Sequence, residues 1–495
     1  MQSYLLAIDA GTTSIRAMLF DHSAQLIHCT QKTLNQYFPD DGWVEHDPEE
    51  IWQTTLSLCR QVISESAIQS KQIASIGITN QRETTLIWDR QTHKAIYPAI
   101  VWQDRRTESY CQAIRKGRFE SEITHKTGLL IDPYFSATKI QWLLDNIDNA
   151  RELAENGRLA FGTIDSFLLW RFTGGKQHAT DATNASRTLL YNIRTNQWDN
   201  EILEQLTIPV SLLPEVKDSS DNFGVTDTEL FGHAISINGI AGDQQSAAIG
   251  QACFHPGMLK STYGTGCFML FNTGNHIVTS KHKLLSTIAY RINHQTSYAI
   301  EGSIFNAGST VQWLKDNLNC FSHIDEIEPM LSSINDNGGL TFIPAFTGLG
   351  APFWDAKARG AIFGLTRNSN IAHIVRAAIE SIAYQTKDLV QAMIDDGADH
   401  PSQLRVDGGM VNNNWLCQFL ADILSVEVER PRFTETTALG VAFLAGLHIG
   451  MFSSLDELSQ VWQKERSFNS KLNRQHANSL YQGWLAAINH VKITP

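Results

Sequence analysis

Short apolar runs separated by polar turns open the chain. The apolar run at residues 4–8 predicts a strand, and the glycine- and threonine-containing segment 9–13 predicts a tight turn. Residues 15–20 predict a second strand, and a third is expected after residues 21–22. The chain is therefore predicted to begin with a β-meander.

Helical and strand-like patterns then alternate. Residues 73–83 and 85–89 have the composition of two strands around a polar turn. In residues 49–66 the apolar positions recur with the spacing of an amphipathic helix. The first half of the chain is therefore predicted to be mixed α/β.

A similar design returns in the second half. Residues 259–263 predict a strand that runs into a glycine and threonine turn at 264–266, just after the turn signal His-Pro-Gly at 255–257. Residues 371–395 predict a long helix, and residues 404–424 read as strand, glycine turn and helix. These patterns suggest a duplicated architecture.

Length and composition agree with two folded domains. A chain of 495 residues is too long for one ordinary hydrophobic core, and we expect domains at 1–252 and 253–495. Hydrophobic residues make up 42% and charged residues 18%, which is typical of a compact folded protein. The formal net charge of −12 argues against sequence-independent binding to nucleic acid or to anionic membranes.

The cysteines and the apolar stretches indicate the compartment. Seven scattered cysteines, none in a CxxC pair, predict neither a disulfide framework nor a zinc site. The beginning of the chain lacks a basic signal-peptide region, and the longest apolar stretch, 438–452, is shorter than the roughly 20 residues that span a bilayer. We therefore expect a cytoplasmic protein without membrane insertion.

Two loops are candidates for binding phosphate. In residues 9–16, Gly11 lets backbone amides face outward, Thr12, Thr13 and Ser14 offer hydroxyl donors, and Arg16 adds a positive charge. The segment 261–267 repeats the strand, glycine and hydroxyl pattern. Either loop alone could be an ordinary hairpin turn, but two of them could hold phosphates from opposite sides of a cleft. No P-loop, protein-kinase or GxSxG motif is present in the sequence.

Two further segments combine glycine with polar side chains. Residues 406–414 contain two glycines and three asparagines, which suit an adenosine site or, equally, an asparagine-rich start of a helix. Asp243 follows a strand and a glycine at the start of a small-residue helix, where it could cap the helix or act as general base for an alcohol.

A polyol site has its own candidates. Arg82 and Glu83 could donate to and accept from hydroxyl groups, or they could form a surface ion pair of little consequence. Trp102 and Tyr134 could be core aromatics or the wall against the carbon face of a small polyol.

Together these segments resemble the glycerol kinases of the FGGY carbohydrate kinase family, over nearly the whole chain. The matching segments include ITNQRETT at 78–85, AIVWQDRRT at 99–107, GIAGDQQ at 239–245, STYGTGCFML at 261–270 and RVDGGM at 405–410. The resemblance implies an α/β, two-lobed ribonuclease H-like, actin-like ATPase fold of duplicated mixed sheets flanked by helices, with the active site in the cleft. The implied activity is transfer of a phosphoryl group from ATP, with Mg²⁺, to glycerol, giving sn-glycerol 3-phosphate for glycerol catabolism.

The resemblance also assigns roles to single residues. The glycerol-binding positions are Arg82, Glu83, Tyr134, Asp243 and Gln244, with Trp102 and Phe268 as the apolar wall, and Asp243 is the catalytic base. The ATP or ADP positions are Thr12, Thr13, Ser14, Arg16, Thr265, Gly308, Gln312, Gly409 and Asn413. Asp9 matches the carboxylate near magnesium, which it is expected to reach through water.

Two departures from the family pattern change the expectations. Ala10 stands where glycerol kinases commonly have glutamine, which bears on rate or phosphate geometry. Residues 224–236 lack the glycine- and arginine-rich loop that binds a sugar bisphosphate effector in some bacterial members, so we expect no such feedback. The family also suggests a homodimer or homotetramer. The alternatives are an FGGY kinase for a ketose or erythritol, and a non-catalytic actin-like nucleotide binder.

Overall fold

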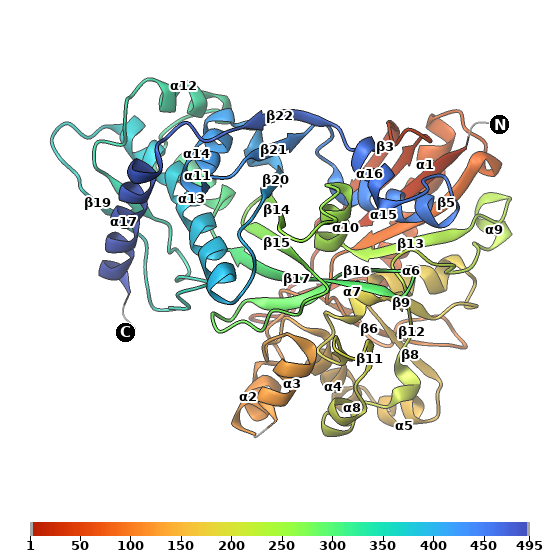
Figure 1. Ribbon diagram of the computed structural model, residues 1–495. Helices are drawn as coiled ribbons and strands as arrows, with labels where there is room; N and C mark the ends of the chain where they lie inside the picture. Colours follow the sequence, from red (N-terminus) through yellow and green to blue (C-terminus); the bar gives the residue numbers. More distant parts are fainter. Residues whose placement is uncertain (1–2, 118, 493–495) are drawn as a thin grey trace.

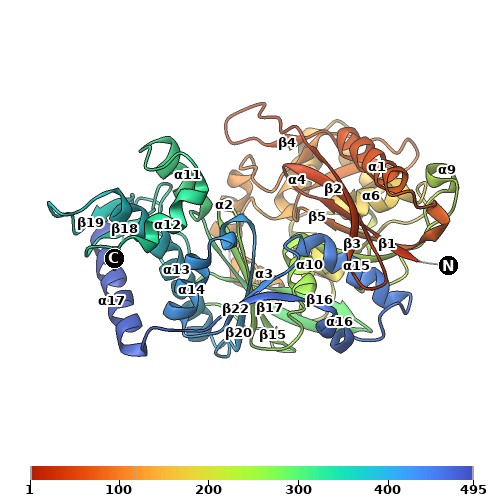
Figure 2. The ribbon, with the colours of Figure 1, turned by 90° about the horizontal axis from the view of Figure 1, so that it is seen from above.

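The computed structural model describes residues 3–117 and 119–492 and has two lobes. One lobe carries the first strands and helix α1, and the other carries helices α11–α14 and α17 (Figure 1). Seen from above, the two lobes lie side by side, with the strands of the second sheet between them (Figure 2). The prediction of a two-lobed α/β fold is therefore confirmed.

The sheet of the first lobe has five strands within the described residues. Its order is β13 (Ile237–Gly242), β5 (Ile73–Asn80), β1 (Tyr4–Ala10), β2 (Ser14–Phe20) and β3 (Leu26–Thr33). Strand β1 pairs antiparallel with β2 and parallel with β5, so it is central and all seven of its residues are buried. The uniformly apolar run at residues 4–8 is what a strand covered on both faces requires.

The sheet of the second lobe repeats this arrangement. In the described part of the chain it has seven strands, in the order β16 (Leu285–Ile292), β17 (Gln295–Ile304), β15 (Cys267–Gly274), β14 (Met258–Tyr263), β20 (Gln403–Asp407), β21 (Val428–Pro431) and β22 (Lys464–Phe468). Strand β14 pairs antiparallel with β15 and parallel with β20, as β1 does with β2 and β5. The predicted duplication is therefore present in the strand order.

Helices cover both sheets and begin at residues that cap them. Helix α1 (Pro48–Glu65) packs on β1, β2 and β3, and Asp47 caps it by accepting the backbone N–H of Glu49 at 2.8 Å. Helix α13 (Ile371–Asp395) has the bounds predicted from its pattern, and the side chain of Asn370 caps it. The other helices of the second lobe are α11 (Gly308–Asp316), α12 (Ile327–Ser332), α14 (Asn414–Leu424) and α17 (Arg474–Val491).

Helix α15 (Thr436–His448) lies late in the chain but packs against β1, β5 and β13 of the first sheet and against α10 (Asp243–Gly250) (Figure 1). Glycines allow this close approach. A Cβ atom at Gly440 would lie 1.9 Å from the carbonyl oxygen of Ser246, and one at Gly77 would lie 2.3 Å from that of Val441. The helix that carries Asp243 is therefore held by a segment from the far end of the chain.

Smaller elements complete the two lobes. The helices are α2 (Glu108–Lys116), α3 (Glu120–Thr127), α4 (Ser136–Asn146), α5 (Ala150–Glu155), α6 (Ile164–Phe172), α7 (Ala182–Ala185), α8 (Asn200–Gln205), α9 (Thr228–Phe231) and α16 (Leu455–Val461). The strands are β4 (Glu45–His46), β6 (Leu86–Asp89), β7 (Ala99–Ile100), β8 (Leu159–Gly162), β9 (Ala179–Asp181), β10 (Tyr191–Asn192), β11 (Gln197–Trp198), β12 (Glu215–Lys217), β18 (Thr341–Ile343) and β19 (Ala361–Phe363). Across residues 3–117 and 119–492, no helix has the length and apolar character needed to cross a membrane.

Candidate active site

The first candidate phosphate loop joins β1 to β2. The backbone N–H of Gly11 donates to the carbonyl of Ser14 at 3.1 Å, which closes a tight turn. Thr12 and Ser14 are half-buried and Thr13 is exposed, so the three hydroxyl residues remain accessible. Ala10 is buried at the end of β1, and its carbonyl accepts the N–H of Gln81 at 2.9 Å.

A carboxylate and a guanidinium face each other across the base of this turn. Asp9 of β1 pairs in register with Arg16 of β2, and Arg16 Nη1 lies 3.6 Å from Asp9 Oδ2 and 2.6 Å from Glu435 Oε2. Burial raises the pKa of Asp9 to about 7, against the lowering effect of Arg16; Asp243 and Glu435 raise it further. A buried carboxylate that is so poorly compensated favours a nearby cation.

Asp9 fits a magnesium site in which phosphate and water supply most ligands. Within the residues that the structure covers, no three His, Cys, Asp or Glu side chains form a group that could hold a metal by themselves. Mg²⁺ is usually held by one or two carboxylates together with substrate phosphates and waters. The single carboxylate of Asp9 beside a hydroxyl-rich turn is compatible with that donor set.

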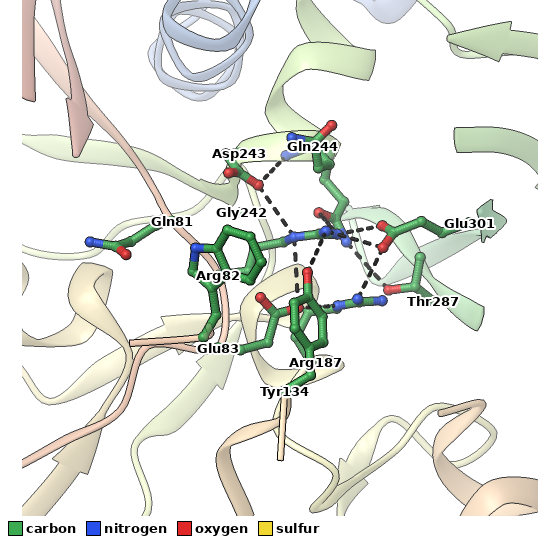
Figure 3. Close-up of polar contacts among 12 residues, drawn as sticks. Gln81, Arg82, Glu83, Tyr134, Arg187, Gly242, Asp243, Gln244, Thr287 and Glu301 are labelled. Atoms are coloured by element: carbon green, nitrogen blue, oxygen red, sulfur yellow. Dashed lines mark hydrogen bonds and ion pairs between the residues drawn. The ribbon is translucent and has the colours of Figure 1, made fainter. Parts of the chain in front are cut away.

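Arg82 and Glu83 lie in the turn between β5 and β6, where both side chains are almost fully buried (Figure 3). Arg82 Nε lies 3.2 Å from Asp243 Oδ1, and its two terminal nitrogens contact the carboxylate of Glu301 at 2.5 and 3.1 Å. Glu83 Oε1 accepts from Arg187 Nε at 2.7 Å. The alternative of a surface ion pair is therefore wrong, because these charges lie in the interior.

Aromatic side chains lie beside the buried charges. The rings of Trp102 and Tyr134 meet edge to face, with centroids 5.5 Å apart. Tyr134 Oη lies 3.5 Å from Arg82 Nη2, and Trp102 Nε1 donates to Thr12 Oγ1 at 2.9 Å. We call Trp102 and Tyr134 the aromatic wall. The Trp102–Thr12 hydrogen bond joins this wall to the phosphate loop. Phe268 of β15 is half-buried and lies opposite Ser303 of β17.

Asp243 is the first residue of helix α10, which begins where β13 ends. Its Oδ1 accepts the backbone N–H of Gln244 at 2.6 Å, and 29% of the side chain is exposed. The N-cap position belongs to Gly242, whose side chain is absent, so the alternative that Asp243 caps the helix is wrong. Burial raises the pKa of Asp243, while Arg82 lowers it.

Gln244 has a partner that the sequence did not suggest. Lys260 of β14 is buried and donates from Nζ to Gln244 Oε1 at 2.8 Å. Burial lowers the pKa of Lys260, whereas Asp407 and Asp243 raise it. Lys260 is the one charged residue of β14, and this was the signal available in the sequence for this contact.

A cavity of about 870 Å³ opens in the second lobe between the β14–β15 turn, α11 and the segment before α14. Five predicted nucleotide positions line it: Thr265, Gly308, Gln312, Gly409 and Asn413. Gly308 is tightly packed, since a Cβ atom there would lie 2.5 Å from the carbonyl oxygen of Gly264. Asn413 also caps α14 by accepting the N–H of Leu416 at 3.0 Å. The predicted start of a helix in residues 406–414 is therefore confirmed at Asn413.

Family models match both halves of the chain. The N-terminal domain of the FGGY family of carbohydrate kinases matches residues 4–250, and the C-terminal domain of the same family matches residues 259–449. The chain is 56% identical over 492 residues to a glycerol kinase of Ectopseudomonas mendocina, covering 99% of each chain. It is also 56% identical over 489 residues to a glycerol kinase of Coxiella burnetii, covering 99% of this chain and 97% of that one.

Solved structures share the fold over the full length. A glycerol kinase of Plasmodium falciparum with ADP superposes with a TM-score of 0.95 at 38% identity, covering 100% of this chain and 99% of that one. A xylulose kinase of Lactobacillus acidophilus superposes with a TM-score of 0.88 at 22% identity, covering 99% and 98% of the two chains. The second match bears on the fold alone.

Proposed function

Because the chain belongs to the FGGY family of carbohydrate kinases, we infer that it transfers the γ-phosphoryl group of ATP to glycerol. The inference is supported by 56% identity to glycerol kinases over almost the whole chain. We further propose that the product is sn-glycerol 3-phosphate, formed in glycerol catabolism.

One observation carries this proposal most directly. The buried pair Arg82 and Glu83, the aromatic wall and Asp243 adjoin one another, and Trp102 connects them to Thr12 of the phosphate loop at 2.9 Å. A small triol needs both donors and acceptors for its hydroxyls and an apolar surface for its carbons. These groups supply all three beside a candidate phosphate site.

Asp243 is the proposed general base. Its carboxylate would accept the proton of the attacking glycerol hydroxyl while Arg82, 3.2 Å away, keeps it oriented. A weak base is adequate, because proton transfer lags behind bond cleavage in a loose phosphoryl-transfer transition state. Most of the acceleration would come from positioning the hydroxyl in line with the γ-phosphorus.

The phosphates are proposed to bind at Thr12, Thr13, Ser14 and Arg16, with the adenosine in the cavity of about 870 Å³ in the second lobe. Mg²⁺, held through water by Asp9 and by phosphate oxygens, would neutralise charge on the phosphates. The role of Asp9 is supported by its burial and by the weak compensation that Arg16 gives it at 3.6 Å.

Several wider assignments remain our proposals. We keep the domains at 1–252 and 253–495, a homodimer or homotetramer, and a lack of sugar-bisphosphate feedback through residues 224–236. A cytoplasmic location is supported by the seven cysteines, all of which are free thiols in the structure. A ketose-specific kinase and a non-catalytic scaffold are the alternatives that an experiment must separate.

ADP release by the purified protein tests the function. We would compare glycerol with dihydroxyacetone, erythritol, xylulose and ribulose in the presence of MgATP, and identify the product. Strong preference for glycerol is expected. Preference for a ketose would indicate a ketose kinase of the same family, and no stimulation by any acceptor would contradict kinase activity.

A variant tests the base. Asp243→Asn should lower kcat by about 10²–10⁴-fold, the usual contribution of a general base, and leave glycerol and ATP binding within several-fold. Asp47→Asn is the matched control, since asparagine also caps helices and residue 47 caps α1. Near-normal turnover of Asp243→Asn would remove Asp243 from the base role.

A further inference from the structure

Four buried charged side chains form a closed ring beside the proposed glycerol pocket (Figure 3). We call Arg82, Glu83, Arg187 and Glu301 the ion-pair ring. Glu301 contacts Arg82 at 2.5 and 3.1 Å and Arg187 at 3.0 Å. Arg187 contacts Glu83 at 2.7 Å, and Glu83 lies 3.8 Å from Arg82 Nε. Two of the four, Arg187 and Glu301, were not predicted as site residues from the sequence.

The ring is neutral and almost completely shielded from water. Each of its side chains is at most 3% exposed, and its two positive charges balance its two negative charges. Burial alone would raise the pKa of Glu301, but Arg187 and Arg82 hold that pKa at about 2. Removing one member would leave an unbalanced charge in the interior, which is costly.

The four residues come from segments that are distant in the chain. Arg82 and Glu83 lie in the turn after β5, and Arg187 lies two residues beyond α7. Glu301 comes from β17 of the second sheet, and the neighbouring strand β16 packs on α7. The second lobe therefore contributes a carboxylate that contacts Arg82 and Arg187 of the first lobe.

Glu301 and Arg187 each restrain one proposed glycerol ligand, Arg82 and Glu83 respectively. Glu301 contacts both terminal nitrogens of Arg82, which fixes the plane of its guanidinium. Arg187 holds one oxygen of Glu83, and its guanidinium carbon lies 5.9 Å from the ring centroid of Tyr134 and 5.4 Å from that of Phe135. Neither contact involves the phosphate loop or the nucleotide cavity.

We propose that Glu301 and Arg187 are positioning residues for glycerol, with Glu301 orienting the guanidinium of Arg82 and Arg187 orienting the carboxylate of Glu83. The proposal rests on the glycerol kinase activity inferred above. A polar site binds tightly only when its donors and acceptors are held in place before the substrate arrives. Disturbing the ring should therefore weaken the binding of glycerol far more than that of ATP.

Glu301→Gln is the first test, because the amide keeps the size of the side chain but removes its charge. The variant should raise KM for glycerol by about 10-fold or more, as loss of a buried charged hydrogen bond does, and change KM for ATP by less than about 3-fold. Glu301→Asp, which keeps the charge, should recover part of the affinity. Direct titration of glycerol by calorimetry should show the same loss.

Asp388→Asn is the matched control. Asp388 is a buried carboxyl residue of α13 in the same lobe, and it is bonded to Tyr481 at 2.6 Å and Trp484 at 2.8 Å rather than to a member of the ring. The control reports what replacing a buried carboxyl group by an amide does to folding alone, and its KM for glycerol should stay within about 2-fold of the wild type. Arg187→Lys keeps the charge but loses the forked contact, and it provides a second test if Glu301→Gln does not fold.

The outcomes separate this proposal from the proposed function. Selective loss of glycerol affinity in Glu301→Gln or Arg187→Lys supports the positioning role. If the wild type phosphorylates glycerol and both variants change KM for glycerol no more than Asp388→Asn does, the positioning role is wrong and the activity stands. A wild type that does not turn over glycerol overturns both.

Discussion

Arg16, a proposed phosphate ligand, is already paired with a carboxylate of its own chain. Its Nη1 lies 2.6 Å from Glu435 Oε2, just before helix α15, and the two side chains are 28% and 41% exposed. To bind Arg16, phosphate oxygens must displace Glu435 from the guanidinium, and they must approach the negative charge of Glu435 as they do so. Glu435→Gln, which removes the charge at nearly constant size, should therefore strengthen nucleotide binding.

The size of the effect follows from the exposure of the pair. A partly exposed ion pair contributes about 0.2–1 kcal/mol. Since about 1.4 kcal/mol corresponds to a tenfold change in an equilibrium constant, the dissociation constant for ADP should fall roughly 1.4- to 5-fold. Salt screens such pairs, so the difference between variant and wild type should shrink between about 0.05 M and 0.5 M salt.

Calorimetric titration with ADP and Mg²⁺ measures this change. Glu49→Gln is the matched control, because Glu49 pairs with Arg171 at 2.7 Å with similar exposure, away from the cleft. The control should bind ADP like the wild type. Weaker binding by Glu435→Gln would refute the reasoning, since Glu435 would then orient Arg16 for the phosphates rather than compete with them.

Two further predictions concern stability. Burial raises the pKa of Asp388 to about 7, so the folded protein keeps a proton there that the unfolded chain loses near the ordinary pKa of 3.8. The stability that this proton contributes is lost as the pH rises from 3.8 through about 7. The melting temperature of Asp388→Asn relative to the wild type should therefore improve from pH 5 to pH 8, and an unchanged difference would contradict the burial argument. Gly440→Ala should lower the melting temperature strongly, because its Cβ atom would lie 1.9 Å from the carbonyl oxygen of Ser246. Gly483→Ala in α17 is the control: it has open space around it and should be neutral or stabilising by up to about 1 kcal/mol. Equal melting temperatures of the two variants would refute the packing argument.

The sequence predicted those elements whose signals are local. Helix α13 has the predicted bounds because its apolar periodicity is long and Asn370 caps it. The strands on either side of residues 11–13 follow from apolar runs beside a glycine turn. The strand order of the two sheets then agrees with the duplication suggested by the two glycine and hydroxyl loops.

Contacts between residues that are distant in the sequence could not be predicted from such local patterns. Arg187 stands in an ordinary polar segment, and nothing nearby in the sequence shows that it meets Glu83 and Glu301. Glu301 did leave a signal, because it is the one charged residue of β17 and its position in the strand is buried. Such a residue needs a buried partner, but which one depends on how the strands are arranged in space.

The position of helix α15 also determines when the protein can finish folding during synthesis. Leu5, Ala7, Phe20 and Ala241 of the first sheet belong to one hydrophobic cluster with residues of α15, which the ribosome makes more than 400 residues after β1. Domains usually fold as units while the chain emerges. Here the first lobe must wait, with one face of its sheet uncovered, until nearly the entire chain has been translated. Chains that end before residue 436 should therefore aggregate rather than yield a free N-terminal lobe.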